Sequence, residues 1–216
     1  MKKTAFIFLL MMLSLVLLVS CNQSETSEES LTTTTPDITT PIAPNTTTVI
    51  TTEPGLQEPM PGEPTEGFIF VEGMDYYSIE GIREDVLVEE LVIPATYNGK
   101  PVMMIGGFSL HPTITSVYIP DGVLSIMDLA FAGCEHLEYV RIPETLSTIE
   151  NSAFAECPNL TSIYLPESVV KMGEGVFWGD ESLTIYCQLK EYPRNNPDWH
   201  FHWNATGCPV VWDYAR

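Results

Sequence analysis

The sequence predicts a solenoid in which short parallel β-strands stack into one sheet and are joined by single helical turns and irregular return paths. The main observation is a repeat of period 23, whose copies begin at Leu129, Ser152 and Gly175. The three phrases are LAFAGCEHLEYVRIP at 129–143, SAFAECPNLTSIYLP at 152–166 and GVFWGDESLTIYCQL at 175–189. A fixed period of this kind indicates stacked repeats, because one repeat cannot bury its apolar side alone.

Apolar residues recur in columns at the same period, and these columns predict the core. Within one repeat, apolar and polar residues alternate from Leu160 to Leu165, which indicates a short strand with one buried face. Pro166 then ends the strand, because proline cannot donate a ladder hydrogen bond. The clearest columns are Phe131, Phe154 and Phe177; Leu137, Leu160 and Leu183; and Val117, Val140 and Ile163.

The return path between strands predicts a single helical turn in each repeat. Asn151 or Ser152 can cap this turn, so that Ala153 and Phe154 point inward. The turn closes at Cys157, before the next strand begins.

An earlier copy of the repeat begins at Leu91 and is less regular. The insertion TYNGK at 96–100 makes the step from Pro94 to Pro120 longer than the step from Pro120 to Pro143. Insertions of this kind map to loops on one side of a solenoid. The stretch IGGFSLHPTI at 105–114 lacks the Ala-Phe pair and the cysteine of its repeat, so we expect an irregular first rung.

The pattern L-x-x-V-x-I-P followed by I-x-x-x-A-F-x-x-C resembles the BspA-like subfamily of bacterial leucine-rich repeats. The stretches YYSIEGI at 76–82, LVIPATYNGKPV at 91–102 and WNATGCPVVWDY at 203–214 are similar to that family too. The resemblance implies a leucine-rich-repeat solenoid with an N-terminal cap at 67–90, repeats at 91–189 and a C-terminal cap at 190–216. It also implies an exported bacterial surface protein linked to adhesion and protein binding.

The start of the chain predicts a lipoprotein signal peptide at residues 1–20. Lys2 and Lys3 precede an apolar run from Ala5 to Val19, as in a secretion signal. This run is shorter than the roughly 20 residues of a membrane-spanning helix. It ends in Leu-Val-Ser-Cys, which resembles a bacterial lipobox, so Cys21 is expected to carry lipid and to anchor the protein in a membrane. A short uncleaved anchor or an ordinary signal peptide is the alternative.

Beyond Cys21, residues 22–66 are rich in threonine and proline and contain no lysine, arginine or aromatic residue. Such a segment cannot bury enough apolar surface to offset its ordering entropy, so we expect a disordered, acidic linker. Proline and acidic charge stiffen and extend such linkers. The segment therefore predicts a spacer that holds the repeat domain away from the membrane.

The chain is strongly acidic, with a formal net charge of −20. Residues 67–216 contain 21 Asp and Glu against 7 Lys and Arg, a net charge of −14. A surface this acidic repels phosphate backbones, which excludes nucleic acid as a partner. It also makes anionic headgroups poor partners, so the membrane contact is expected through the lipid on Cys21.

Four cysteines remain once Cys21 is set aside. Cys134 and Cys157 lie in the repeat column and are expected to be buried thiols, since free cysteine behaves as a small apolar residue; a disulfide between them is the alternative. Cys187 and Cys208 are expected either to form a disulfide that pins the C-terminal cap or to remain two buried thiols.

Three tryptophans near the end of the chain predict a lid on the last repeat, because a solenoid needs capping segments for solubility. They are Trp199, Trp203 and Trp212. His200 and His202 alternate with aromatic residues, but their spacing is not that of a zinc ribbon or finger, so we expect no metal.

The outward strand positions supply the candidate ligand face. Tyr118, Arg141 and Tyr164 occupy one slot in successive repeats, and they are flanked by Ser116, Tyr139 and Ser162. Tyr and Arg are enriched in binding hot spots, although they also suit strand surfaces for structural reasons. We expect this face to bind a protein, such as a host-matrix or envelope component.

Catalysis and cofactors are not expected. The chain has no Gly-rich phosphate loop, no G-x-S-x-G elbow and no H-E-x-x-H motif. The alternatives to protein binding are a carbohydrate-binding accessory, in which exposed tryptophans stack on sugars, and a structural spacer of the envelope. Burial of the tryptophans would remove the sugar platform.

Overall fold

A computed structural model describes residues 63–194 and 196–215, which lie in one compact unit spanning residues 50–216. The expected signal peptide, Cys21 and all but the last residues of the linker lie outside the described residues. The described part contains β-strands and turns and no α-helix. The strands are β1 (Phe68–Glu72), β2 (Tyr77–Ile82), β3 (Glu90–Val92), β4 (Thr96–Tyr97), β5 (Lys100–Ile105), β6 (Ser116–Tyr118), β7 (Ser125–Ile126), β8 (Tyr139–Arg141), β9 (Thr148–Ile149), β10 (Ser162–Leu165), β11 (Lys171–Met172), β12 (Thr184–Cys187) and β13 (Val210–Val211).

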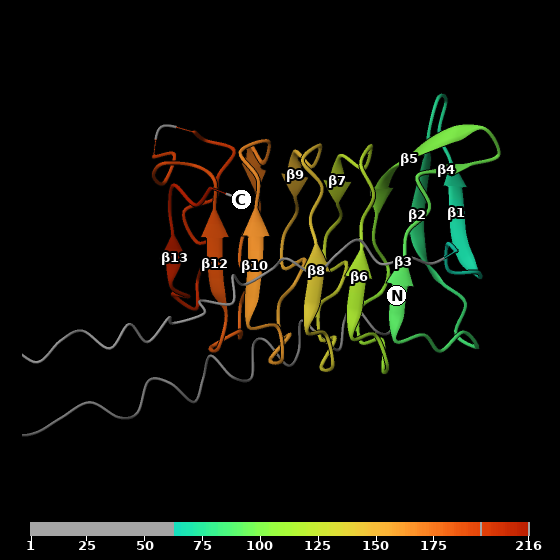
Figure 1. The fold of residues 1–216 in the computed structure, drawn as a ribbon, viewed down its shortest axis with the longest axis horizontal. Helices are drawn as coiled ribbons and strands as arrows, with labels where there is room; N and C mark the ends of the chain where they lie inside the picture. Colours follow the sequence, from blue (N-terminus) through green and yellow to red (C-terminus); the bar gives the residue numbers. More distant parts are fainter. Residues whose placement is uncertain (1–62, 195, 216) are drawn as a thin grey trace, which may run out of the picture. The chain divides into compact units, whose positions relative to one another are not determined.

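The predicted parallel strands line one side of a solenoid. They pair in the orders β3-β6-β8 and β10-β12-β13 and run side by side in the same direction (Figure 1). We call their outward side the strand face. The solenoid expected from the period is confirmed, because β6, β8 and β10 begin at the equivalent repeat positions Ser116, Tyr139 and Ser162.

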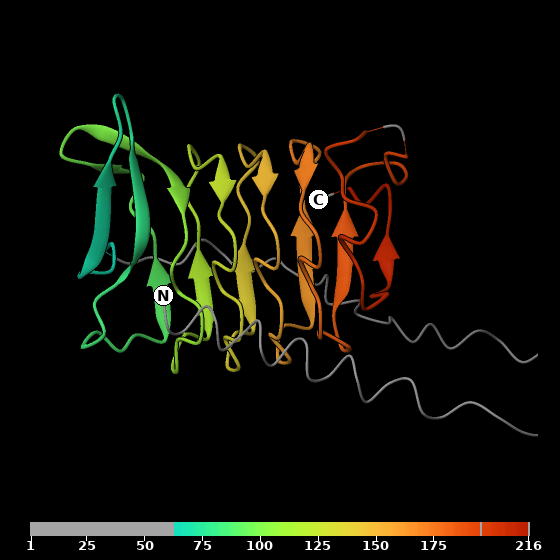
Figure 2. The same cartoon turned by 180° about the vertical axis from the view of Figure 1, so that it is seen from behind.

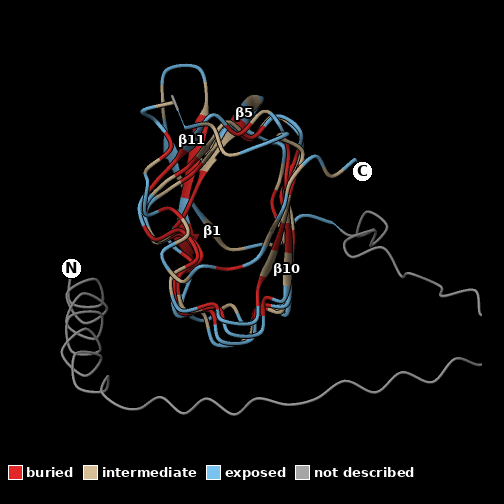
Figure 3. Cartoon of the chain, turned by 90° about the vertical axis from the view of Figure 1, so that its left-hand side faces the viewer, coloured by how far each residue is buried: buried red, intermediate tan, exposed pale blue. Residues whose placement is uncertain are grey.

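A second sheet covers the opposite side, and the expectation of one sheet was wrong on this point. The short strands β7, β9 and β11 lie on the return paths and pair in parallel with each other. They extend a seven-stranded sheet in the order β1-β2-β5-β7-β9-β11, with β4 paired to β5 (Figure 2). Viewed along the stack, β10 and β11 lie on opposite walls, and both walls carry buried residues (Figure 3).

The predicted helical turns are absent from the described repeats. Two positions of each return path have a left-handed backbone, such as Leu129 (φ 56°) and Gly133 (φ 70°), or Ser152 (φ 51°) and Glu156 (φ 59°). A right-handed helix cannot contain them. The reason lies in the amides between them, because Phe131 N–H donates to Ala153 O of the next repeat at 2.8 Å. An α-helix would need these amides for its own carbonyls.

A stack of phenylalanines runs through the core. The rings of Phe108, Phe131, Phe154 and Phe177 are stacked with successive centroid distances of 5.2, 5.4 and 5.9 Å. All four side chains are almost completely buried. The first rung therefore keeps the register of the core although it lacks the Ala-Phe pair and the cysteine.

The N-terminal end of the stack is closed by aromatic side chains. Phe68 of the antiparallel β1–β2 hairpin meets Phe108 edge-on at 6.1 Å. The TYNGK insertion forms the β4–β5 hairpin, whose turn residues Asn98 and Gly99 have positive φ, as this turn type requires. Tyr97 of that hairpin stacks on Phe70 at 3.7 Å. The insertion thus helps to cover the end of the solenoid.

The C-terminal end is closed by tryptophans. Trp203 meets Phe177 edge-on at 6.2 Å and contacts Trp199 at 5.3 Å. Trp199 and Trp203 are 3% and 5% exposed, and Trp212 lies against Trp203. Trp199 and Trp203 are too deeply buried to stack on a sugar, whereas Trp212 is partly buried.

All four described cysteines are free, buried thiols, so Cys187 and Cys208 are not joined in this structure. Cys134 donates to Phe108 O at 3.2 Å, and Cys157 donates to Phe131 O at 3.3 Å. Burial raises the pKa of Cys134 to about 11, so this thiol stays protonated at neutral pH. The repeat cysteines are therefore hydrogen-bonded members of the core.

Asp180 occupies the cysteine position of the next repeat. It is 1% exposed, and its Oδ1 accepts a hydrogen bond from Cys157 N–H at 2.6 Å. Its Oδ2 is buried without a hydrogen-bond partner among the described residues. Burial raises the pKa of Asp180 to about 7, because the charged form loses its hydration.

We expect Asp180 to make the stability of the repeat domain depend on pH. Its pKa is higher in the folded chain than the value of 3.8 of an unperturbed carboxyl. The folded state therefore binds the proton more tightly, and this stabilisation is full below pH 3.8 and is lost as the pH rises through about 7. Asp180→Asn keeps the acceptor for Cys157 and removes the titration.

Urea unfolding of residues 22–216 between pH 4 and pH 8 measures this effect. The free energy of unfolding of the wild type should fall with pH relative to that of Asp180→Asn, by up to about 1.4 kcal/mol per pH unit. The readout is the difference between the two proteins, since burial raises the pKa of Glu156 in both. Parallel pH profiles would show that Asp180 does not titrate in this range.

Candidate functional site

The strand face presents its outward side chains in two columns. Inward residues such as Val117 and Val140 alternate with them and are buried. Neighbouring strands in a sheet lie about 4.8 Å apart, so each column has a regular spacing within β3-β6-β8 and within β10-β12. The first column is Glu90, Ser116, Tyr139, Ser162 and Thr184, and the second column is Val92, Tyr118, Arg141, Tyr164 and Tyr186.

Arg141 lies on Tyr118 in the second column. Its guanidinium is 4.8 Å from the centre of the Tyr118 ring, a cation–π contact. Its Nη1 donates to Ile119 O at 2.7 Å, and its Nη2 lies 3.5 Å from Asp121 Oδ1. The side chain is 21% exposed. Arg141 therefore holds a fixed position, because part of its guanidinium group is already bonded within the chain.

Tyr164 belongs to a second aromatic group, on β10 and β12. Tyr214 of the C-terminal segment lies 5.9 Å from Tyr164 and 4.9 Å from Tyr186, measured between ring centres. The backbone of this segment is held by hydrogen bonds, among them Tyr214 N–H to Cys187 O at 3.1 Å. The C-terminal cap thus contributes a side chain to the strand face.

Tyr186 and Tyr214 also belong to this face, although they are not among the residues predicted for it. Tyr186 pairs with Tyr164 although it comes one position earlier than the usual period would place it. The sequence does contain a signal for Tyr186, because the segment TIYC at 184–187 has the same pattern as SIYL at 162–165. Tyr214 lies outside the repeats, and no periodicity could place it.

A polar groove of about 540 Å³ crosses the N-terminal ends of the strands. Two of its side chains are bound to neighbouring repeats: Thr115 donates to Glu89 O at 3.0 Å, and Asn159 donates to Glu135 O at 2.6 Å. Of its lining residues, Ser116, Tyr139 and Ser162 were predicted to flank the ligand face. The groove is lined by Glu90, Thr115, Ser116, Glu138, Tyr139, Asn159, Thr161 and Ser162.

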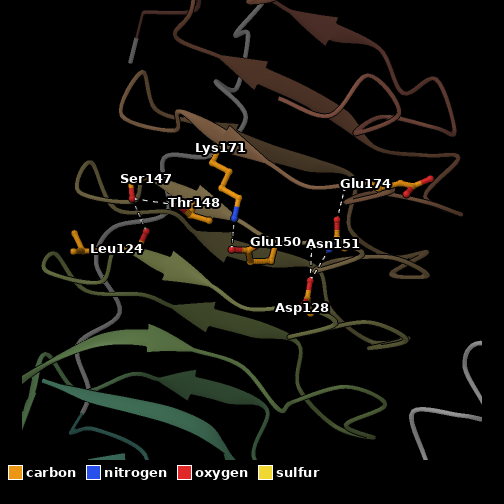
Figure 4. Close-up of polar contacts among 8 residues, drawn as sticks. All are labelled: Leu124, Asp128, Ser147, Thr148, Glu150, Asn151, Lys171 and Glu174. Atoms are coloured by element: carbon orange, nitrogen blue, oxygen red, sulfur yellow. Dashed lines mark hydrogen bonds and ion pairs between the residues drawn. The ribbon is translucent and has the colours of Figure 1, made fainter. Parts of the chain in front are cut away.

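The opposite face uses its polar side chains to join repeats (Figure 4). Asp128 Oδ1 accepts hydrogen bonds from the backbone N–H and the side-chain amide of Asn151, each at 2.9 Å. Asn151 Oδ1 in turn accepts from Glu174 N–H at 2.8 Å, and Lys171 pairs with Glu150 at 2.8 Å. These side chains have structural roles, which distinguishes this face from the aromatic strand face.

Neither a metal centre nor a membrane span is found in the described part of the chain. Across residues 63–194 and 196–215, no three His, Cys, Asp or Glu side chains gather in a way that could hold a metal ion. His200 and His202 have ring centres 5.9 Å apart beside the exposed Phe201. The described residues also contain no helix long and apolar enough to cross a membrane.

Comparisons with known proteins agree with this architecture. Residues 106–191 match the model of the BspA type leucine rich repeat region, with six copies. A leucine-rich repeat protein from Bacteroides capillosus is 32% identical over 58% of this chain and 96% of its own length, with a TM-score of 0.51. The chain belongs to the BspA-type leucine-rich-repeat family.

A more distant neighbour shares the fold of this BspA-type chain. It is a leucine rich cell surface protein from Faecalibacterium prausnitzii, 22% identical over 70% of this chain and 39% of its own length, with a TM-score of 0.55. No curated protein matches the sequence.

Proposed function

We propose that this chain is a lipid-anchored, non-catalytic protein of the bacterial surface that binds another protein through its strand face. The observation that carries the proposal is the second column, where Tyr118, Arg141, Tyr164 and Tyr186 follow one another on β6, β8, β10 and β12. Rigid aromatic side chains lose little conformational entropy on binding and are enriched in hot spots. The half-buried aromatic rings leave this face pre-organised for a partner.

Charge defines the class of partner. The net charge of −14 for residues 67–216 favours a protein with a basic or neutral patch, in the host matrix or in the cell envelope. Electrostatic attraction of this kind weakens as the salt concentration rises. Because Asp121 and Ile119 O already bind the Arg141 guanidinium, we assign Arg141 the role of orienting Tyr118 more than that of binding a carboxylate.

The substitution of Tyr118, Arg141 and Tyr164 by alanine together should strongly weaken partner capture. These side chains are only half-buried, so the variant should still fold, with the same circular dichroism as the wild type. A pull-down with residues 22–216 against host-matrix and envelope fractions measures capture. We expect a loss of about tenfold or more, equivalent to about 1.4 kcal/mol.

The matched control is Lys171→Ala with Phe201→Ala, which removes an ion-paired base and an exposed aromatic ring elsewhere on the chain. It should capture as the wild type does. If the triple variant also captures normally, the binding face lies elsewhere, and the β4–β5 hairpin becomes the next candidate. If the wild type captures no protein at all, the role of a structural spacer is favoured.

Lipid on Cys21 supplies the surface attachment in this proposal. The lipobox-like Leu-Val-Ser-Cys and the preceding charged and apolar regions support it. The Faecalibacterium relative, described as a cell surface protein, supports a surface location for this chain as well.

Cys21→Ala should release the protein from membranes and abolish its labelling by fatty acid. Membrane fractionation after growth with a labelled fatty acid measures both. The control is Cys208→Ala, which removes a cysteine of the repeat domain and should leave labelling intact. Unchanged labelling of Cys21→Ala would contradict the lipid attachment.

A further inference from the structure

The polar groove runs along the stack, across four successive strands. Glu90, Ser116, Tyr139 and Ser162 are consecutive members of the first column, on β3, β6, β8 and β10. A ligand in this groove would therefore lie perpendicular to the strands and contact the same position of four repeats. A groove of this form suits an extended chain better than a compact molecule.

The groove is negative, and the bases of the domain do not neutralise it. Glu90 and Glu138 line it, and Glu89 and Glu135 are exposed beside it. No lysine or arginine lines it. In the described part of the chain, the Lys and Arg ion pairs involve other acids, namely Glu72, Asp85, Asp121 and Glu150. The carboxylates of the groove are thus available for positive charges from outside.

The spacing of these carboxylates matches an extended peptide. Glu90 on β3 and Glu138 just before β8 are two strands apart, or about 10 Å. A peptide in the extended polyproline II conformation has three residues per turn and advances about 3.1 Å per residue, so the side chains of residues i and i+3 lie on the same face, about 9 Å apart. The ring of Tyr139 offers a surface on which a lysine or arginine stem can lie. The nearby Thr161 and Ser162 can hydrogen-bond the peptide backbone.

We infer that this groove binds an extended, cationic segment of the partner protein, with basic residues at a spacing of three. The inference rests on the proposed function and adds to it the location and the chemistry of the contact. It assigns Glu90 and Glu138 as the residues that select positive charge. Tyr118 and Tyr164, in the adjoining second column, provide additional contact area for the partner beside the groove.

The test is the binding of a fluorescent synthetic peptide, lysine at every third position with serine between, to residues 22–216 by fluorescence anisotropy. The same peptide with glutamate in place of lysine should not bind. Binding of the lysine peptide should weaken steeply between about 20 mM and 300 mM salt, as screening of exposed charges requires. Absence of binding at low salt would overturn the inference.

Two charge-matched variants separate the groove from the general acidity of the domain. Glu90→Gln with Glu138→Gln should weaken binding by about tenfold or more. Glu144→Gln with Glu167→Gln removes the same charge at the opposite ends of β8 and β10, where both side chains are exposed. This control should change affinity by no more than about twofold. Equal losses in both variants would show attraction by net charge alone and would overturn the inference.

A neutral oligosaccharide serves as the second probe. Binding of the sugar that is lost in Glu90→Gln with Glu138→Gln, without binding of the lysine peptide, would assign the groove to a glycan and overturn the inference. The two proposals also fail separately. If the Tyr118, Arg141 and Tyr164 variant loses partner capture but the wild type ignores the lysine peptide, the strand face still binds protein and only the groove assignment is wrong.

Discussion

The structure depends on backbone hydrogen bonds that each repeat donates to the next. On the return path, the amides of Leu129, Phe131 and Gly133 donate to carbonyls at equivalent places in the following repeat, at 2.8 to 3.0 Å. The same pattern recurs one repeat later, where Phe154 N–H donates to Val176 O. These bonds fix the register between repeats, and the fixed register brings the phenylalanine rings into one stack. To point alternate N–H groups toward the neighbouring repeat, some residues must adopt the left-handed backbone conformation, which is locally unfavourable.

The same register explains how the domain presents a binding surface. The residue types at buried positions are determined by packing against the neighbouring repeat. Only the outward positions can therefore carry side chains that recognise a ligand. On the opposite face, Asp128 and Asn151 join repeats, whereas the strand face carries tyrosines and an acidic groove. Both ends of the stack require covers, which Phe68 and Trp203 provide. The C-terminal cover also brings Tyr214 onto the strand face, and so links the cap to the proposed site.

The period, the buried columns and the strand positions could be predicted from the sequence because they follow from spacing alone. The second sheet could not, because strands as short as Thr148–Ile149 cannot show an alternating pattern. The left-handed Leu129 and Ser152 carry no glycine signal, so a helical turn was the natural expectation. The polar groove combines residues from four strands without any motif, and the spacing of the repeat predicted only the flanking Ser116, Tyr139 and Ser162 at this face. The groove forms only when the repeats stack and bring these side chains together.

Amide hydrogen exchange measured by NMR tests the role of the bonds between repeats most directly. If these bonds hold the stack, the amides of Leu129, Phe131 and Gly133 should exchange only on global unfolding, as slowly as the strand amides of Val140 and Ile163. Turns held by local bonds alone would open independently of the sheet. Exchange of the Phe131 amide that is orders of magnitude faster than that of Val140 would therefore contradict the account.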